Sequence, residues 1–314
     1  MTDIRKIIID TDPGQDDAAA LMLAFASPKE LEILGICAVA GNVPLSYTSR
    51  NTRIVCELSG RSDIPVYEGA LGPLERPQVT AEHVHGKTGL DGAELPEPVM
   101  MAQAQNAIDF IIETLRREPA GTVTLCTLGP LTNIASALLK APDIAPRVRE
   151  LVMMGGGCFE GGNITPAAEF NIFVDPQAAD IVLKSGMPIV IMPLDVTHQL
   201  LTTKARVARI AAIGTRPAQV MVEWLQFFER FDEEKYGSDG GPLHDPTVIA
   251  YLIKPELFSG RDCNVEIETT SELTMGMTVV DWWRVSGRPA NARFMRTVDA
   301  DGFFDLLIER LALL

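Results

Sequence analysis

The sequence is poor in basic residues. Its 27 Lys and Arg residues stand against 42 Asp and Glu residues, so the formal net charge is −15 at pH 7. Binding of a polyanion or an anionic membrane needs a basic surface. This balance argues against DNA, RNA or an acidic membrane as a partner. A small neutral molecule suits a chain of this charge better.

The chain also lacks paired-cysteine motifs and long apolar runs. Its cysteines are odd in number and form no Cys-x-x-Cys pair: Cys37, Cys56, Cys126, Cys158 and Cys263. That pattern indicates reduced thiols rather than a disulfide framework. No stretch has the form of a secretory signal, and no apolar run is long enough to cross a bilayer. We therefore expect a cytoplasmic protein.

Internal repeats, low-complexity tracts and linker-like breaks in composition are absent as well. With 314 residues, of which 46% are hydrophobic, the chain can bury one large core. We expect a single domain that spans residues 1–314.

What the sequence does have is a dense acidic stretch, Asp10-Thr-Asp-Pro-Gly-Gln-Asp-Asp17. It places four carboxylates in eight residues, between an apolar run at 7–9 and an alanine-rich run at 18–26. Pro13-Gly14 is typical of a tight turn, so the pattern predicts a strand, a turn and a helix start. A helix N-terminus stabilises a carboxylate by only about 0.3–1 kcal/mol, and close like charges repel by a comparable amount or more. We therefore expect a cation among these acids.

Helix capping is the ordinary explanation for one Asp before a helix. Four together behind an apolar strand favour a hard divalent ion, because Ca²⁺ and Mg²⁺ prefer oxygen ligands and no Cys or His lies nearby to suit zinc. The spacing is not that of an EF-hand, since Leu21 stands at the twelfth position from Asp10, where that loop needs Glu. The ion must collect further ligands from distant parts of the chain.

Strand-like and helix-like segments alternate along most of the chain. Strands are predicted at 7–9, 33–39, 65–67, 122–127, 151–154 and 189–193, and helices at 18–26, 46–59, 103–117, 132–139, 204–213 and 218–231, with others opening at Asp175-Pro176 and His244-Asp245-Pro246. Segments 264–269, 278–283 and 291–297 alternate like an antiparallel patch, before a closing helix at 303–313. This order predicts an α/β fold, with a largely parallel sheet covered by helices on both faces.

Polar residues follow the predicted strands, at the ends where ligands bind in such sheets. Taken singly, Asn42 is a turn residue, Asn163 a loop residue, Asp245 a helix cap and His244 a satisfied edge histidine. Their joint placement indicates a site. The long segment 69–98, rich in proline and glycine, is typical of a lid or binding loop.

Several motifs together resemble the inosine–uridine-preferring nucleoside hydrolases. They are IIIDTDPGQDDAAA, VAGN, HGKTGLDG, LGPLTNIA, VMMGGG, AAEFNIFVDPQAA and GPLHDP, and they run from the N-terminus to residue 246. The resemblance implies a Rossmann-like, single-domain open sheet, mostly parallel with an antiparallel portion. It also implies Ca²⁺-dependent hydrolysis of the N-glycosidic bond of purine or pyrimidine ribonucleosides, and a homo-oligomer, tetramer or dimer.

Matching positions carry the family's roles to this chain. The resemblance implies that Ca²⁺ is held by the side chains of Asp12, Asp17 and Asp245 and by the backbone carbonyl of Leu128, where relatives often have Thr. It gives catalytic roles to Asp12 as the base that activates water, to His244 on the side of the leaving group, and to Asn171 beside the ribosyl ring. Substrate contacts are implied for Asp16, Asn42, Met154, Asn163, Glu169 and Asn171, and for His85 and Tyr236 in loops that face the base.

Two other readings of the acidic stretch remain open at this stage. The run Ile-Ile-Ile-Asp10-Thr-Asp12 also looks like the start of a haloacid-dehalogenase-type Mg²⁺ phosphatase, although that motif requires Thr or Val where Gly14 stands. A non-catalytic nucleoside- or ribose-binding protein is the second alternative, but nothing marks two lobes around a hinge. Neither the preferred nucleobase nor the residues that read it follow from the sequence, because the loops at 69–98 and 232–241 have the weakest patterns.

Overall fold

An eight-stranded sheet forms the centre of the computed structural model, which describes residues 4–236 and 240–314, with the backbone alone for 231–236. Its order is β3-β2-β1-β4-β5-β6-β10-β7, and every neighbouring pair is parallel except β10 and β7. The strands are β1 (Arg5–Thr11), β2 (Leu31–Ala38), β3 (Val66–Glu68), β4 (Val123–Thr127), β5 (Val148–Met154), β6 (Ile189–Met192), β7 (Phe258–Cys263) and β10 (Ala292–Val298), with β8 (Val265–Ile267) and β9 (Thr278–Val280) in a separate hairpin.

Helices cover both faces of this sheet. They are α1 (Gln15–Phe25), α2 (Leu45–Leu58), α3 (Glu82–His85), α4 (Ala107–Arg117), α5 (Thr132–Lys140), α6 (Phe170–Val174), α7 (Pro176–Leu183), α8 (Leu194–Thr197), α9 (Lys204–Ala211), α10 (Arg216–Tyr236), α11 (Pro246–Ile253) and α12 (Ala300–Leu311), with 3-10 turns at Pro142–Arg147 and Pro255–Leu257. In the part of the chain that the structure describes, no helix is both long and apolar enough to span a membrane.

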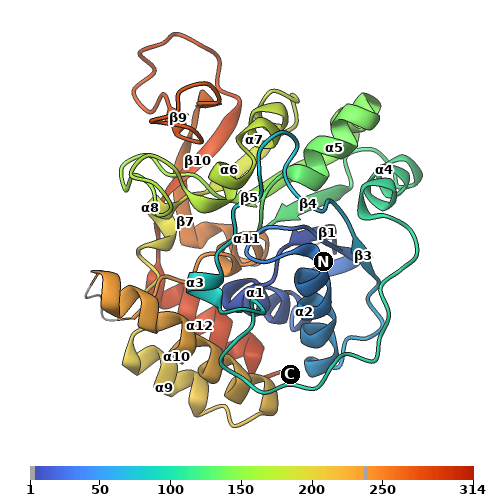
Figure 1. Ribbon diagram of the computed structural model, residues 1–314, viewed down its shortest axis with the longest axis vertical. Helices are drawn as coiled ribbons and strands as arrows, with labels where there is room; N and C mark the ends of the chain where they lie inside the picture. Colours follow the sequence, from blue (N-terminus) through green and yellow to red (C-terminus); the bar gives the residue numbers. More distant parts are fainter. Residues whose placement is uncertain (1–3, 237–239) are drawn as a thin grey trace.

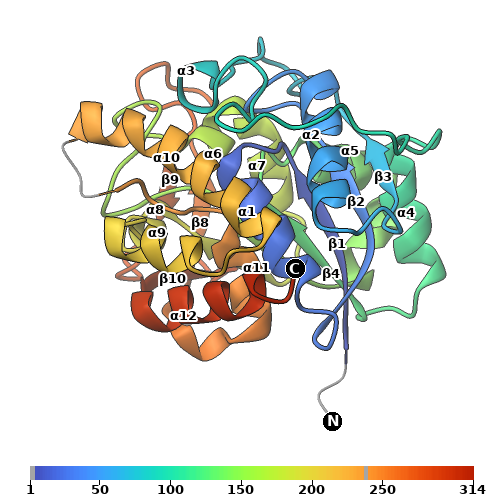
Figure 2. The same cartoon turned by 90° about the horizontal axis from the view of Figure 1, so that it is seen from below.

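A hydrophobic core lies on each face of the sheet, between the strands and the helices that cover them. In β1, Ile7 and Ile9 join the core formed with α1, α2 and α9 to α12, whereas Ile8 joins the core formed with α4, α5 and α7. Successive side chains of a strand point to opposite faces, so an unbroken apolar run is what a strand buried on both sides requires. Figure 1 shows one helical layer above the strands and one below them. Figure 2 shows α9, α10 and α12 together in the layer that contains α1.

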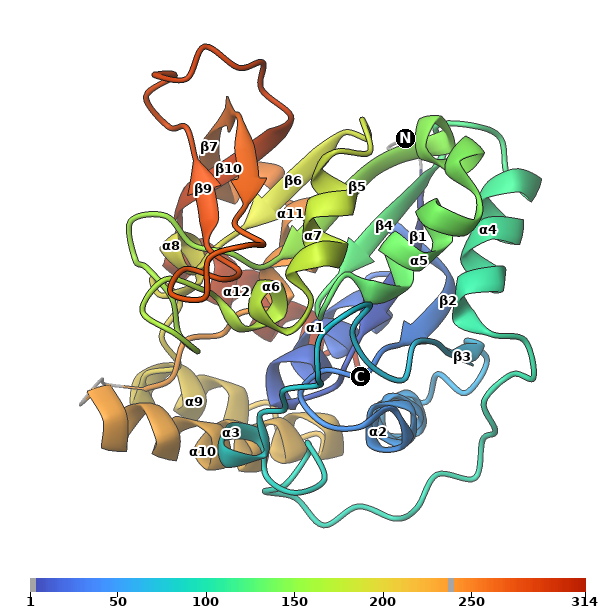
Figure 3. The same ribbon diagram turned by 45° about the horizontal axis from the view of Figure 1, so that its top comes forward.

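The predicted fold class is confirmed, but the predicted C-terminal patch is wrong in its pairing. Only β8 and β9 pair with each other there. The third segment became β10, which runs parallel to β6 and antiparallel to β7, a strand that the sequence did not predict. Figure 3 shows the β8–β9 hairpin standing beyond this end of the sheet. Strand β7, with the sequence FSGRDC, carries too few apolar residues to stand out from a loop.

Short or irregular elements account for the other differences. Helices α3, α6 and α8 have four or five residues each, which is too short for a periodic pattern to mark. The segment from residue 232, expected to be irregular, continues α10 as far as Tyr236. All five cysteines are free, as predicted.

The strand order places a switch point between β1 and β4. From β1 the chain builds outward to β2 and β3, then returns to add β4, β5 and β6 on the other side. The loops after β1 and β4 therefore diverge, and such a crevice at the carboxyl ends of the strands is where open α/β sheets bind ligands.

Candidate functional site

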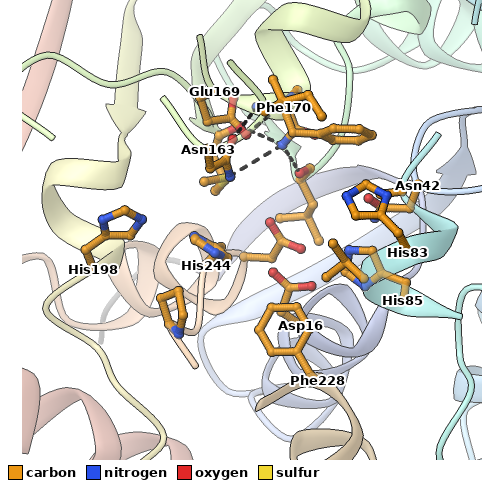
Figure 4. A pocket seen from close by; sticks show the side chains of 18 residues that line it. Asp16, Asn42, His83, His85, Asn163, Glu169, Phe170, His198, Phe228 and His244 are labelled. Carbon is orange, nitrogen blue, oxygen red and sulfur yellow. Dashed lines mark hydrogen bonds between the residues drawn. The ribbon is translucent and has the colours of Figure 1, made fainter. Parts of the chain in front are cut away.

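A pocket opens at this carboxyl edge, and most of the residues singled out from the sequence line it. They come from the ends of β2, β4 and β5, from the loops around α3 and α6, and from the starts of α1 and α11. The predicted residues found there are Asp16, Asn42, His85, Leu128, Met154, Asn163, Glu169, Asn171, His244 and Asp245. Figure 4 shows Asn163 and Glu169 on one wall and Asp16 opposite them.

Asp12 follows β1 directly and is fully buried. Its carboxylate lies between Gly41 and Gly129, where a Cβ atom on either glycine would collide with it. Oδ2 accepts the backbone N–H of Asn42 at 2.8 Å, whereas the buried Oδ1 has no hydrogen-bond partner among the described residues. An unpaired buried carboxylate oxygen costs free energy. A cation beside Oδ1 would remove that cost.

Three further carboxylates gather from the N-termini of two helices that pack together, α1 and α11. Asp16, Asp17 and Asp245 each offer an oxygen, and these oxygens lie within 4.8 Å of one another. Asp17 also closes the turn before α1, because its Oδ2 accepts the backbone N–H of Gly14 at 3.0 Å and its Oδ1 accepts the hydroxyl of Thr11 at 2.5 Å. The side chain of Asp17 therefore both caps the start of α1 and belongs to the acidic cluster.

These carboxylates have little to offset their charge. Among the described residues that line the pocket there is no Lys or Arg. Burial, followed by repulsion from Asp17, raises the pKa of Asp16 to about 7. Burial and repulsion from its acidic neighbours raise the pKa of Asp12 and of Asp245 well above the usual range. Without a cation, the cluster must hold protons instead.

The donor set fits a hard divalent cation. The clustered oxygens are those of Asp16, Asp17 and Asp245. The resemblance adds Asp12 and the main-chain oxygen of Leu128, to which Asn171 Nδ2 donates at 2.7 Å. All these donors are oxygen atoms, the ligand type that Ca²⁺ and Mg²⁺ take. The side chain at position 128 has no part in this contact, because the donor is the main-chain carbonyl. Asp16, assigned to substrate by resemblance, lies in the same cluster.

The opposite wall is formed by Glu169 and Asn171 at the start of α6. Glu169 caps this helix: Oε1 accepts the backbone N–H of Asn171 at 2.9 Å, and Oε2 accepts that of Gly156 at 2.9 Å. Burial raises the pKa of Glu169 to about 7 despite these bonds. Asn163 Oδ1 accepts the N–H of Phe170 at 2.9 Å. The wall is therefore fixed by backbone contacts before any ligand binds.

All four histidines of the chain line the pocket: His83, His85, His198 and His244. His85 Nδ1 bonds Gln15 Oε1 at 2.7 Å, and His244 Nδ1 bonds Thr197 Oγ1 at 2.8 Å. Burial lowers the pKa of both rings to about 3, so both are neutral at pH 7. A neutral imidazole still offers one donor and one acceptor.

Among the lining residues that the sequence did not assign are His83, His198 and Phe228. The scarcity of histidine was a usable signal, since a rare residue gathered at one site is unexpected for surface positions. Phe228 gave no signal, because an aromatic residue on α10 reads as core. Tyr236 ends α10, and its side chain lies outside the described residues.

Comparison with known proteins agrees with this geometry. The sequence matches the family model described as inosine–uridine preferring nucleoside hydrolase over residues 7–305. It is 58% identical over 306 residues to an uncharacterized protein of Schizosaccharomyces pombe, covering 98% of each chain. It is 49% identical over 309 residues to the pyrimidine-specific ribonucleoside hydrolase RihA of Shewanella sp. (strain ANA-3), covering 98% of this chain and 96% of the relative.

Solved structures show the same fold. The purine-preferring ribonucleoside hydrolase from Gardnerella vaginalis superposes with a TM-score of 0.91 at 30% identity, over 98% of both chains. A plant nucleoside hydrolase, PpNRh1, gives a TM-score of 0.88 at 31% identity, over 99% of both chains. These matches decide against the phosphatase and the non-catalytic receptor. The chain belongs to the inosine–uridine preferring nucleoside hydrolase family and is a ribonucleoside hydrolase.

Proposed function

We propose that this enzyme cleaves pyrimidine ribonucleosides, that it uses a bound Ca²⁺ ion, and that Asp12 is its general base. The buried, all-oxygen carboxylate cluster beside the pocket carries the proposal. Relatives that are 48–49% identical over 98% of this chain are named pyrimidine-specific, which supports the choice of base. The lack of Lys and Arg among the described lining residues favours an uncharged nucleoside over a nucleotide, whose phosphate would need cationic partners.

The ribose would lie on the polar floor of the pocket. Asp16, Asn42, Asn163 and Glu169 surround that space with oxygen and amide groups. Asn171 donates its Nδ2 to the carbonyls of Leu128 and Met154, which leaves its Oδ1 for the ribosyl ring. Cleavage builds positive charge at C1′, and fixed negative groups stabilise such a transition state.

Asp12 is suited to take a proton because its Oδ1 is unpaired. A bound Ca²⁺ would supply the positive charge that lowers the pKa of a nearby water and orients the ribose hydroxyls. By resemblance His244 would lie on the side of the base. As a neutral ring whose Nδ1 accepts from the Thr197 hydroxyl, it would donate a hydrogen bond from Nε2–H to the departing base. His85, stacked on Phe228 with ring centroids 5.6 Å apart, would support the base from the other side.

The proposed substrate class can be tested with purified protein. We expect ribose to be released from uridine and cytidine with a higher kcat/KM than from inosine. A polar floor that binds the ribose diol rejects a sugar lacking one hydroxyl by about 10⁴–10⁵-fold. The kcat/KM for 2′-deoxyuridine should therefore fall by about that factor. Equal rates on uridine and 2′-deoxyuridine, or a preference for inosine, would contradict the proposal.

The Ca²⁺ site should also appear in stability. Because the folded pKa of Asp16 is about 7 and its ordinary value is 3.8, the metal-free folded protein binds a proton that the unfolded chain releases above pH 4. Its stability should therefore fall as the pH rises from about 4 to 7. Ca²⁺ at 100 times its Kd adds about 2.7 kcal/mol, or roughly 4 °C in Tm for a chain of this length.

Thermal unfolding with and without a chelator, at pH 5 and at pH 8, measures this effect. We expect a larger Ca²⁺-induced rise in Tm at pH 8, where the carboxylates no longer hold protons. Metal analysis should find about one Ca²⁺ per chain. Only zinc in the untreated protein, or no shift in Tm at either pH, would exclude the ion.

Replacement of the proposed base should remove activity without unfolding the protein. Asp12→Asn keeps the shape of the side chain but loses a ligand charge and the proton acceptor, so kcat should fall by at least about 10³-fold. Asp10→Asn is the matched control: Asp10 is equally buried, burial raises its pKa to about 8, its Oδ2 accepts from Asn133 Nδ2 at 2.7 Å, and its Oδ1 is unpaired like that of Asp12. The resemblance gives Asp10 no part in the metal site or in catalysis. Asp10→Asn should retain activity to within about tenfold. An active Asp12→Asn enzyme would rule out this base.

The role of His244 depends on the leaving group. His244→Ala should lower kcat/KM for uridine by about 10–10²-fold, since a hydrogen bond to a group that becomes charged is worth about 1.5–3 kcal/mol. The fall in kcat/KM for 4-nitrophenyl riboside should be much smaller, because nitrophenolate leaves without a hydrogen bond from the enzyme. Steady-state kinetics with both substrates give the comparison. Equal losses would leave His244 with no part in departure of the base.

A further inference from the structure

His198 occupies the rim of the pocket on the side of His244. It follows α8 directly, and its ring centroid lies 6.1 Å from that of His244. Its side chain is 34% exposed, whereas Asp16 and Glu169 on the floor are buried. Figure 4 shows His198 beside His244 and across the pocket from His83 and His85. A ligand whose sugar lies on the floor would therefore have its base close to His198.

Glu160 determines which nitrogen of His198 faces a ligand. His198 Nδ1 lies 3.2 Å from Glu160 Oε2. A carboxylate only accepts hydrogen bonds, so Nδ1 carries a proton, and in the ring with a single proton Nε2 is an acceptor. No hydrogen bond among the described residues uses this Nε2. It is available to a molecule in the pocket.

Helix α8 fixes this pair relative to the rest of the site. Asp195, which is buried, accepts the backbone N–H groups of Cys158 at 2.8 Å and Phe159 at 2.7 Å, and so fixes the loop that carries Glu160. Thr197, on the same helix, bonds His244 Nδ1. Glu160, His198 and His244 are thus held by one short element. A solvated surface pair would not require such an anchor.

We propose that His198, oriented by Glu160, accepts a hydrogen bond from an N–H group of the nucleobase and so helps to select the base. The inference rests on the proposed hydrolysis of pyrimidine ribonucleosides. Uracil presents an N3–H and cytosine an amino group, and a neutral Nε2 can accept from either. A base methylated at N3 presents no donor at that position. His198 is a specificity-determining residue that touches the base and not the bond that breaks.

The experiment compares uridine with 3-methyluridine. We expect His198→Ala to lower kcat/KM for uridine by about 10–100-fold, as for the loss of one hydrogen bond in a partly buried site. The fall in kcat/KM for 3-methyluridine should be less than about threefold, so the ratio of kcat/KM for uridine to that for 3-methyluridine falls by at least about threefold. His198→Gln, whose amide oxygen can reach the position of Nε2, should keep most of the preference.

Two further measurements distinguish a hydrogen bond between His198 and the base from a purely structural role of His198. Glu160→Gln retains an acceptor for His198 Nδ1 and should keep most of the preference for uridine over 3-methyluridine. Glu160→Ala removes the acceptor that orients the ring and should lower that preference. With 4-nitrophenyl riboside, which has no base N–H, the fall in kcat/KM caused by His198→Ala should be far smaller than with uridine. Equal losses on all three substrates would overturn the inference.

The two proposals fail in different ways. A wild-type enzyme that releases no ribose from uridine or cytidine contradicts the proposed substrate class, and with it the role of His198. A wild-type enzyme that hydrolyses uridine, combined with an unchanged preference for uridine over 3-methyluridine in His198→Ala, contradicts the role of His198 alone.

Discussion

Repulsion among buried carboxylates is the constraint on which this structure depends. Asp12, Asp16, Asp17 and Asp245 are all buried, and no Lys or Arg is among the described residues that line the pocket. Oxygens of Asp16, Asp17 and Asp245 lie within 4.8 Å of one another, and the backbone N–H of Asp12 donates to Asp17 Oδ1 at 3.3 Å. Such an arrangement is stable only when protons or a cation offset the charge. The surrounding backbone is adapted to it. Gly41 and Gly129 leave space for the carboxylate of Asp12, and the turn at Pro13-Gly14 brings two acids into the first turn of α1.

The sheet topology brings these groups together from distant parts of the sequence. Asp12 follows β1 and Asn42 follows β2, on one side of the switch point, while Leu128 follows β4 on the other. Helix α11 packs against α1 and delivers Asp245 to the same place. Since parallel strands all end at one edge, no long loop is needed to assemble the floor of the pocket. The long segment 69–98 is left to cover it, and Gln15 Nε2 fastens that segment through the carbonyls of His85 and Asp91, at 3.1 and 2.9 Å.

The sequence predicted the floor better than the rim. Strands buried on both faces appear as unbroken apolar runs, and acids directly behind such runs are unusual, so Asp12 and its neighbours could be identified without coordinates. The family resemblance then supplied the residues after the other strands. By contrast, β7 carries few apolar residues and α8 has only four residues, so the pairing of β10 and the position of His198 depend on tertiary packing that no local pattern encodes. Phe228 belongs to the same class, because its contact with His85 joins elements more than a hundred residues apart.

Helix α8 is a small element with several attachments, and it separates two parts of the pocket. The reactive floor is built from β1, β2, β4, α1 and α11. The loop at 156–161 is bound to Asp195 through Cys158 and Phe159 and reaches the rim through Glu160, while Gly156 at its start donates to Glu169 in the wall. Exchange of that loop between homologous enzymes would therefore alter the rim while the acidic floor stays intact. Substrate preference in such a fold can change through mutations of a few residues at the rim. The residues that carry out the reaction need not change at the same time. The same separation makes the 156–161 loop a natural target for directed evolution of base selectivity.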